Sequence, residues 1–448
     1  NGGKVPQPDL DVFDPNVPFC IENVGDVQAN VQYNTTNTNI RISKDYKTWN
    51  DYTTGTEIEL NPKDRVYIKS DYAQGTGSNP RFVFNGDGTR LRARGNIASL
   101  IYGTNDAYVN KYTSTEAYCY HYMFHGCTSL TQAPELPATT LASNCYYSMF
   151  SGCISLTQAP ELPATTLSSY CYSYMLKGCT SLTQAPELPA TKLASSCYSN
   201  MFDSCTSLTQ APELPATTLA DWCYNYMFYG CASLTQAPEL PATTLANYCY
   251  YSMFEDCTSL TQAPELPAAT LASSCYRSMF KGCTSLTQAP ELPATILVDS
   301  CYNAMFNGCT KLNYVKCLAT DTYAAGCTYN WLYNVSSTGT FECDNKKYFT
   351  VDSPNGIPVG WSITEINPDV EKPDLDVFDP NVPFCIENVG DVPANVQYNT
   401  KNTNIRISKD YKTWNDYTTG DSITLDPTDR VYIKSDYVKD TGSNPRFV

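Results

Sequence analysis

The sequence predicts an α/β solenoid of short repeats flanked by two all-β domains, and three observations lead to this fold class. The phrase SLTQAPELPA recurs every 26 residues, starting at Ser129, Ser155, Ser181, Ser207, Ser233, Ser259 and Ser285. After each copy come CY, MF (once ML) and usually GC at constant spacing. Outside the repeats, residues 8–83 and 373–448 are copies of one segment that differ at ten positions. A fixed period of this length is typical of a stack in which no single unit buries its apolar face alone.

The first flanking domain is predicted to consist of half-buried strands separated by turns. NIRIS, EIELN and RVYIKS each alternate apolar and polar residues, which is the pattern of a strand with one face in a core. Asn, Gly, Pro and Asp cluster between these runs and favour turns. We therefore expect an immunoglobulin-like or fibronectin-like sandwich, and a second copy that is truncated inside the strand beginning PRFV.

Each repeat is predicted to contain one short strand and one short helix, with leucines at three constant positions facing the core. Pro134 and Pro137 remove two backbone donors, so the parallel ladder between strands should be interrupted. From about residue 143 a helix is expected, because Cys145 and Met149 lie four residues apart and would share one face. Gly152 stands where a left-handed C-cap residue belongs.

These elements give a linear order of domains along the chain. The expected boundaries are 1–7 linker, 8–103 β-sandwich, 104–335 leucine-rich-repeat solenoid, 336–367 C-terminal β cap, 368–372 linker and 373–448 truncated second β-sandwich. Terminal repeats are expected to depart from the consensus because they close the core against water.

The chain has 21 cysteines, and sixteen of them form eight pairs with the spacing of Cys145 and Cys153. This regularity alone would indicate a disulfide scaffold. In a helix, however, the two residues would lie about 12 Å apart along the axis, whereas a disulfide needs Cα atoms within roughly 7 Å. We expect rows of buried free thiols, with disulfides between repeats as the alternative.

The formal charge of −16 argues against two classes of partner. Nucleic acids are bound by neutralising phosphates with Lys and Arg, and an anionic membrane surface is disfavoured for the same reason. No run approaches the roughly 20 apolar residues that span a bilayer, so no membrane insertion is expected within this segment.

The repeats also carry a family resemblance. The phrase GCTSLTQAPELPATTLAS with CYxxMFxGC resembles the BspA-type leucine-rich repeats of surface proteins from host-associated anaerobic bacteria. The leading segment YxTWxxYxxGxxIxLxxxDxVYIK resembles the β-domain that often precedes such repeats. The resemblance implies export and adhesion to host or bacterial surfaces, but it implies no ligand site.

Catalytic and metal-binding patterns are sparse. There is no GxSxG motif, no phosphate-binding loop and no Cys–His pairing suited to a nucleophile. The only histidines, His121 and His125, have the i,i+4 spacing of a metal pair, yet they occupy variable positions. Asp9, Asp11 and Asp14 precede the first β-domain, but their spacing matches no calcium loop. We predict no enzyme, no metal site and no cofactor.

One glutamate per repeat forms a regular row. Its members are Glu135, Glu161, Glu187, Glu213, Glu239, Glu265 and Glu291. Stacked strands would place these side chains about 5 Å apart, where like charges repel. Solvated or turn-capping carboxylates are the expected state, and a bridging cation is the alternative.

The few variable positions of the repeat are the best candidates for a binding face. In a helix, the variable positions on either side of CY and directly after MF would lie on the outer face, opposite the buried Cys and Met side chains. The aromatic residues in these slots are Tyr147, Tyr170, Tyr174, Trp222, Tyr226, Tyr229, Tyr248 and Tyr251. Tyr, Trp, Asn and Ser are also the residues that antibody paratopes favour. Neutral drift at exposed positions is the alternative explanation.

Together these features predict a non-enzymatic extracellular binding protein, a bacterial cell-surface adhesin for glycan or protein. The alternative is a structural fibre or appendage of a bacterium or bacteriophage, on a cell or virion surface, with head-to-tail self-association. No nucleic-acid partner is expected.

Overall fold

The computed structural model divides the chain into two compact units, Asn1–Asn367 and Pro368–Val448. It describes residues 7–37, 39–70, 80–102, 115–351, 354–366, 383–389, 392–399, 405–410, 413–435 and 446–447. The linker expected at 368–372, and all but the last residue of the one expected at 1–7, lie outside the described residues.

The first unit begins with two β-sheets. Its strands are β1 (Phe19–Asn23), β2 (Ala29–Asn34), β3 (Ile40–Ser43), β4 (Asn50–Tyr52), β5 (Glu57–Leu60), β6 (Arg65–Ser70), β7 (Arg81–Asn85), β8 (Leu91–Arg94) and β9 (Leu130–Gln132). One sheet has the order β4-β3-β6-β1-β8-β9, and the other has the order β5-β2-β7. The strands expected in NIRIS, EIELN and RVYIKS are confirmed. The immunoglobulin-like class of this domain stays a prediction.

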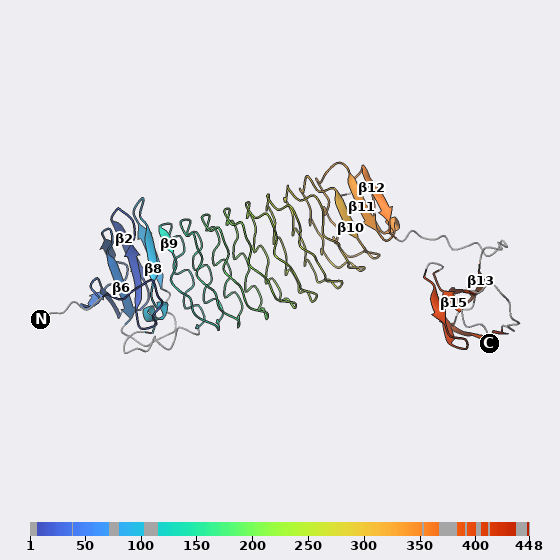
Figure 1. Ribbon diagram of the computed structural model, residues 1–448, viewed down its shortest axis with the longest axis horizontal. Coiled ribbons are helices and arrows are strands. Elements are labelled where there is room, and N and C mark those ends of the chain that lie inside the picture. The colour runs from blue at the N-terminus through green and yellow to red at the C-terminus, as the bar shows by residue number, and fades with distance from the viewer. Residues whose placement is uncertain are drawn as a thin grey trace. The chain divides into compact units, whose positions relative to one another are not determined.

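The β-domain is joined directly to the repeats, as Figure 1 shows. Strand β9 belongs to the first repeat and pairs in parallel with β8. The Phe82 N–H donates to the Met123 carbonyl at 2.8 Å, and the Phe82 ring stacks on Phe124 with centroids 5.2 Å apart. One continuous hydrophobic core runs from Phe19 to Trp361. The β-domain therefore covers the apolar end of the first repeat, which the repeat cannot cover itself.

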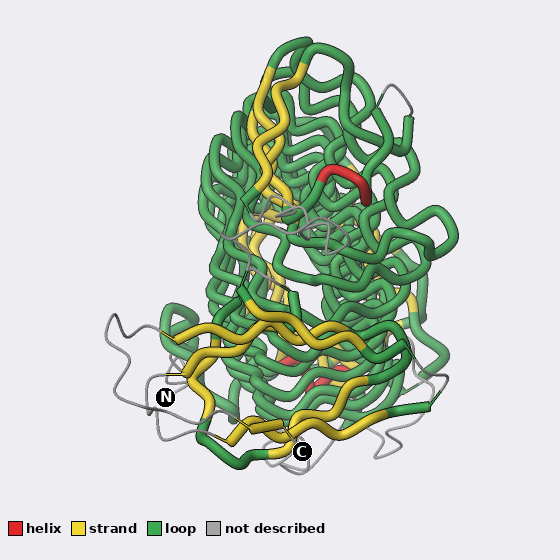
Figure 2. Tube along the Cα trace, turned by 90° about the vertical axis from the view of Figure 1, so that its right-hand side faces the viewer, coloured by secondary structure: helices red, strands yellow, loops and turns green. Residues whose placement is uncertain are grey.

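The predicted helix of each repeat is wrong. The only helical elements among the described residues are two single 3₁₀ turns, η1 (Ile97–Leu100) and η2 (Lys346–Tyr348). Residues 143–152 and their equivalents form consecutive turns, which we call the outer coil. Figure 2 draws these coils in green, the colour of loops and turns. The α/β solenoid assignment is corrected to a stack of leucine-rich repeats without helices.

The hydrogen bonds show how the outer coil differs from a helix. The Met149 N–H donates to the Tyr146 carbonyl at 3.2 Å, within the coil, whereas the Phe150 N–H donates to Met175 of the next repeat at 2.9 Å. Every fourth residue has a positive φ, as at Asn144 (57°), Ser148 (51°) and Gly152 (76°). An α-helix bonds each N–H four residues back in its own segment and excludes left-handed residues. The left-handed conformation predicted for Gly152 is confirmed.

The spacing of the repeats gives a physical reason for the coil. The rings of Phe124 and Phe150 are 5.5 Å apart, and those of Tyr146 and Tyr172 are 5.9 Å apart. Neighbouring repeats thus advance by little more than the ~4.8 Å spacing of strands. A helix with its side chains is about 10 Å wide, so helices would force the repeats to fan out, whereas flat coils stack at this distance.

The opposite side of each repeat carries the phrase SLTQAPELPA, which we call the proline strip. Neighbouring strips meet mostly at isolated parallel bridges, such as Gln184 with Gln210 and Gln236 with Gln262. The predicted interruption of the ladder by prolines is confirmed.

The core of the stack consists of side-chain rows that repeat along its length. Tyr172, Tyr198 and Tyr224 stack with centroids 5.7 and 5.8 Å apart, and Cys145 and Met149 are fully buried. All 21 cysteines are free, in agreement with the expected thiol rows. The face that the sequence pattern assigned to the core is therefore the buried one, although the element is a coil.

Three parallel strands close the other end of the stack. They are β10 (Tyr314–Cys317), β11 (Gly339–Cys343) and β12 (Trp361–Glu365). Trp331 continues the tyrosine row beyond Tyr302 and is itself covered by Phe349, with centroids 6.4 and 6.1 Å apart.

The second unit repeats the first β-domain. Its strands are β13 (Phe384–Glu387), β14 (Ala394–Asn399), β15 (Ile405–Ser408), β16 (Asn415–Tyr417), β17 (Ser422–Leu425), β18 (Arg430–Ser435) and β19 (Arg446–Phe447). Phe384 pairs with Ile433 as Phe19 pairs with Ile68. Phe384 is nevertheless 56% exposed, whereas Phe19 is fully buried, because Phe19 contacts the rings of Phe82 and Phe124. The predicted domain boundaries stay predictions.

Candidate ligand-binding surface

The eight aromatic residues predicted as a binding face all lie on the outer coil. Tyr170 is exposed and the other seven are half-buried. Tyr170, Tyr174, Trp222, Tyr226 and Tyr248 also occupy the left-handed positions of the coil, with φ between 53° and 60°. A bulky residue is uncommon in this region, which Gly and Asn tolerate better. The backbone of the coil therefore gives no local reason for aromatic residues at these positions.

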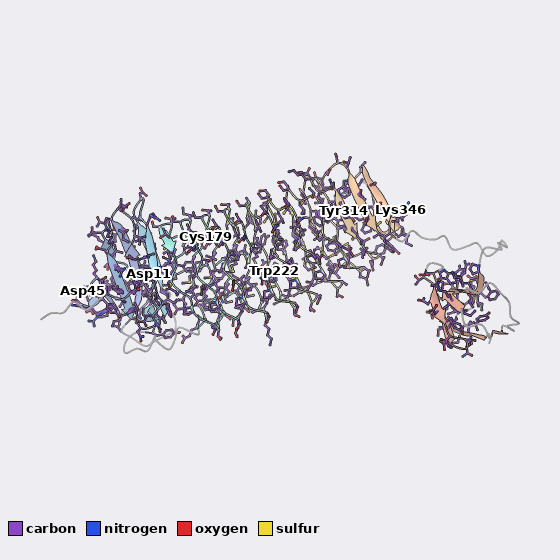
Figure 3. All side chains as sticks on the ribbon, viewed as in Figure 1. Asp11, Asp45, Cys179, Trp222, Tyr314 and Lys346 are labelled. Carbon is purple, nitrogen blue, oxygen red and sulfur yellow. The ribbon has the colours of Figure 1, made fainter. Side chains whose placement is uncertain are left out.

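Five of the predicted residues form one contiguous group. This central cluster comprises Trp222, Tyr226, Tyr229, Tyr248 and Tyr251. Trp222 and Tyr248 stack face to face at 3.9 Å, and Tyr226 meets the edge of Tyr251 at 4.9 Å. The Arg277 guanidinium lies 5.5 Å from the Tyr251 ring. Trp222 is labelled in Figure 3. The cluster contains aromatic faces and edges, one cation and the hydroxyls of four tyrosines, all of which a ligand can use.

Two ion pairs border the central cluster on the outer coil. Lys177 Nζ lies 2.8 Å from Asp203 in the two repeats before the cluster. Lys281 Nζ of the repeat after the cluster lies 2.8 Å from Glu255, which belongs to the same repeat as Tyr251. Tyr229 lies between them in the same slot of the repeat. Burial, together with the charges of nearby carboxylates including Glu255, raises the pKa of Tyr229. Like any tyrosine, it keeps a protonated hydroxyl at neutral pH, which can donate a hydrogen bond.

The other predicted residues belong to a second group near the β-domain. Tyr147 contacts the rings of Tyr122 and Tyr174, each with centroids 5.4 Å away, and Lys177 lies 5.5 Å from the Tyr174 ring. Burial, followed by the neighbouring Tyr122, raises the pKa of Tyr147 to about 12. Tyr170 lies in the repeat that holds Tyr174. We call the tyrosines of this group the N-terminal cluster: Tyr118, Tyr122, Tyr147, Tyr170 and Tyr174.

Sequence reasoning missed Tyr118 and Tyr122. They lie 26 residues before Asn144 and Ser148, so the register of the repeats was the signal that would have found them. His121 and His125 each meet the Tyr122 ring edge to face at 5.5 Å, and both belong to this aromatic group. Burial, with the nearby Arg81 charge, lowers the pKa of His125.

The remaining candidates are accounted for by local contacts. The Asp11 carboxylate lies 3.4 Å from Arg94 and 3.5 Å from Arg92, while Asp9 and Asp14 accept backbone N–H bonds two residues on. Their copies in the second domain, Asp374, Asp376 and Asp379, lie outside the described residues. Within the described ranges, no group of three or more His, Cys, Asp or Glu residues is placed to hold a metal ion.

The glutamate row is exposed along most of its length. Its two end members are paired with cations, Glu135 with Arg94 at 3.0 Å and Glu291 with Lys316 at 2.7 Å. The expected solvated state agrees with this exposure.

These features define a class of protein: a helix-free stack of leucine-rich repeats with a regular core and an aromatic outer face. Residues 111–234 and 223–330 match the family model for the BspA type leucine rich repeat region, in six copies. Residues 111–330 are thus similar to BspA-type leucine-rich repeats. No match was found among curated proteins or among solved structures. No helix in the described part of the chain is long and apolar enough to cross a membrane.

Proposed function

We propose that the protein is a non-enzymatic extracellular binding protein, an adhesin on a bacterial surface that recognises glycan or protein through the two aromatic clusters. BspA-type repeats support a surface-associated repeat protein. Aromatic rings give large contact area at low entropic cost, and Trp, Tyr and Arg dominate binding hot spots.

One observation carries this proposal: the repeats vary on one exposed surface and not on the other. Thr235, Gln236, Glu239 and Pro241 of the proline strip are exposed, yet each is identical in all seven units. The outer slots differ from unit to unit and collect Tyr and Trp. Neutral drift acts on both exposed surfaces, so it does not explain why the outer coil varies while the proline strip is identical in every unit.

The test uses the full chain on an array of host glycans, matrix proteins and bacterial capsular polysaccharides. The double variant Trp222→Ser/Tyr248→Ser introduces the residue that Ser196, Ser274 and Ser300 already provide in the same slot, so the fold should be retained. Loss of two aromatic hot spots should weaken binding at least about tenfold. The control is Ser274→Ala/Ser300→Ala, which leaves the clusters intact.

Binding to host ligands that is lost only in the aromatic variant would support the adhesin. Unchanged binding by that variant, or no binding at high protein concentration, would contradict it. The alternative function, a fibre or appendage component, is favoured by the continuous core that makes the β-domain and the stack one unit, and such a spacer would bind nothing on the array.

A further inference from the structure

A pocket of about 570 Å³ lies where the first β-domain meets the first two repeats. Phe13 and Arg94 of the β-domain form one wall, and the proline strips that begin at Ser129 and Ser155 form the rest. Its volume falls within the range of roughly 300–1,000 Å³ that small-ligand sites occupy. It lies on the proline strip, not on the outer coil, so it is separate from the aromatic clusters.

The pocket contains an ion pair with unused hydrogen-bonding capacity. Arg94 Nη1 donates to Glu135 Oε1 at 3.0 Å, and Nη2 reaches Asp11 at 3.4 Å; Figure 3 labels Asp11 beside the first coils. Arg94 is only 9% exposed, yet its Nε atom and Glu135 Oε2 are buried without a hydrogen-bond partner. Protein atoms cover these two atoms, so a ligand would contact the ion pair through the exposed parts of its side chains, 11% of Arg94 and 31% of Glu135.

The lining excludes an extended peptide that adds a strand. Such a peptide needs main-chain N–H and C=O partners at a sheet edge. Pro134, Pro137, Pro160 and Pro163 line the pocket, and proline has no N–H to donate. The polar groups that line the pocket belong instead to side chains. They include the amides of Gln132 and Gln158 and the carboxylates of Glu135 and Glu161.

The chemistry of these groups fits a hydroxylated ring. Sugar hydroxyls both donate and accept, which matches carboxylates that only accept, a guanidinium that only donates, and amides that do both. Phe13 and the proline rings supply apolar surface for the C–H face of a sugar. Two carboxylates, Glu135 and Glu161, line the pocket together with one guanidinium, so the pocket is net negative and disfavours an acidic ligand. We propose that this junction pocket binds a neutral saccharide unit.

The site is restricted to the junction although its residues recur. Gln236 and Glu239 are the equivalents of Gln158 and Glu161 three repeats further on, and all four side chains are exposed. The later repeats have no counterpart of the wall that Phe13 and Arg94 provide here. Gln236 and Glu239 are therefore matched control positions for Gln158 and Glu161.

The experiment titrates the full chain with trisaccharides of glucose, N-acetylglucosamine and galacturonic acid, followed by saturation-transfer NMR. At least one neutral trisaccharide should bind more tightly than the galacturonic acid trimer. Gln158→Ala, an exposed substitution, should raise its Kd by about three- to tenfold for one lost hydrogen bond. Gln236→Ala should leave the Kd unchanged. Glu161→Gln should reduce the difference in Kd between the neutral and the acidic trisaccharides, because it removes one negative charge from the pocket. Glu239→Gln should leave that difference unchanged.

Three results of the sugar titrations would overturn the proposal, and a fourth comes from the aromatic variant. They are no binding of either neutral trisaccharide, tighter binding of the acidic one, and equal weakening by Gln158→Ala and Gln236→Ala. Neutral sugar binding lost in Trp222→Ser/Tyr248→Ser but kept in Gln158→Ala would also overturn it, because the sugar would then occupy the outer face. Failure of the aromatic clusters to bind anything leaves this pocket unaffected.

Discussion

The second cysteine of each repeat joins two repeats through its thiol. Cys179 Sγ donates to the Phe150 carbonyl at 3.2 Å, and Cys205 Sγ donates to the Leu176 carbonyl at 3.1 Å. The same contact recurs at each following repeat up to Cys309. Burial raises the pKa of Cys179 from 9.0 to about 12, and burial raises the pKa of Tyr276 and its equivalents in the same direction. A protonated thiol both fills the core and gives this carbonyl a second donor, because the carbonyl already accepts a backbone N–H, as Phe150 does from Cys153 at 3.0 Å.

We expect the stack to lose stability at alkaline pH for this reason. An unfolded thiol ionises above about pH 9, whereas the folded thiol keeps its proton to about pH 12. The folded state thus binds more protons in this window, and each such thiol costs about 1.4 kcal/mol of stability per pH unit. Thermal unfolding followed by circular dichroism should give a constant midpoint up to about pH 9 and a falling midpoint above it. A midpoint that stays constant to pH 11 would contradict the assignment of buried, hydrogen-bonded thiols.

At the scale of one element, the outer coil depends on left-handed residues at regular positions. Gly308 has a φ of 78°, and a Cβ added there would lie 3.6 Å from Gly282 in the preceding repeat. The space is sufficient, so the cost of a side chain comes from the backbone conformation. Ser204 and Asp256 occupy the same slot with φ near 60°, which shows that the coil tolerates the strain in some repeats.

Gly308→Ala should therefore destabilise the protein by about 1 kcal/mol without changing the fold. The measurement is the shift of the thermal unfolding midpoint, together with a far-ultraviolet spectrum that lacks the paired minima of an α-helix. Ser204→Ala is the matched control, because the residue already holds a left-handed Cβ and loses only its hydrogen bond to Asp203. A gain in stability for Gly308→Ala, or a helical spectrum, would show that the segment is a helix after all.

At the scale of the whole molecule, the first β-domain and the stack share one core. Phe19 is fully buried, with the rings of Phe82 and Phe124 at 5.2 and 6.0 Å, and Phe124 belongs to the first repeat. Its copy Phe384 stands in the same register but is mostly exposed. The two copies of one sequence thus differ in how far their cores are closed.

Phe19→Ala should destabilise the first unit by about 3–5 kcal/mol, because it removes a buried ring and leaves a cavity at the junction. Phe384→Ala should cost about 1 kcal/mol or less, because that ring is already exposed. Differential scanning calorimetry of the two variants measures both effects in the full chain. Equal shifts in the two variants would mean that the repeats do not contribute to the core of the β-domain.

Much of this architecture was predictable from the chain alone. The 26-residue period, the duplicated β-domain, the interruption by prolines and the left-handed Gly152 all follow from local rules. So does the buried side of each repeat, because Cys145 and Met149 recur with the same spacing in every unit. The aromatic slots were found by comparing units within one sequence.

Three features needed the tertiary structure. A four-residue spacing is compatible with both a helix and a series of turns. The 5.5 Å distance between the Phe124 and Phe150 rings shows that neighbouring repeats are too close for helices, so the segment forms turns. Residues 26 apart, such as Trp222 and Tyr248, become neighbours only when the repeats stack. The junction pocket joins Arg94 to Glu135, 41 residues on. The sequence by itself therefore determined the repeat and its buried face, because both depend on a short-range pattern of residues. Contacts between repeats, and between the first repeats and the β-domain, decided that the outer segment is a coil and brought together the aromatic clusters and the junction pocket.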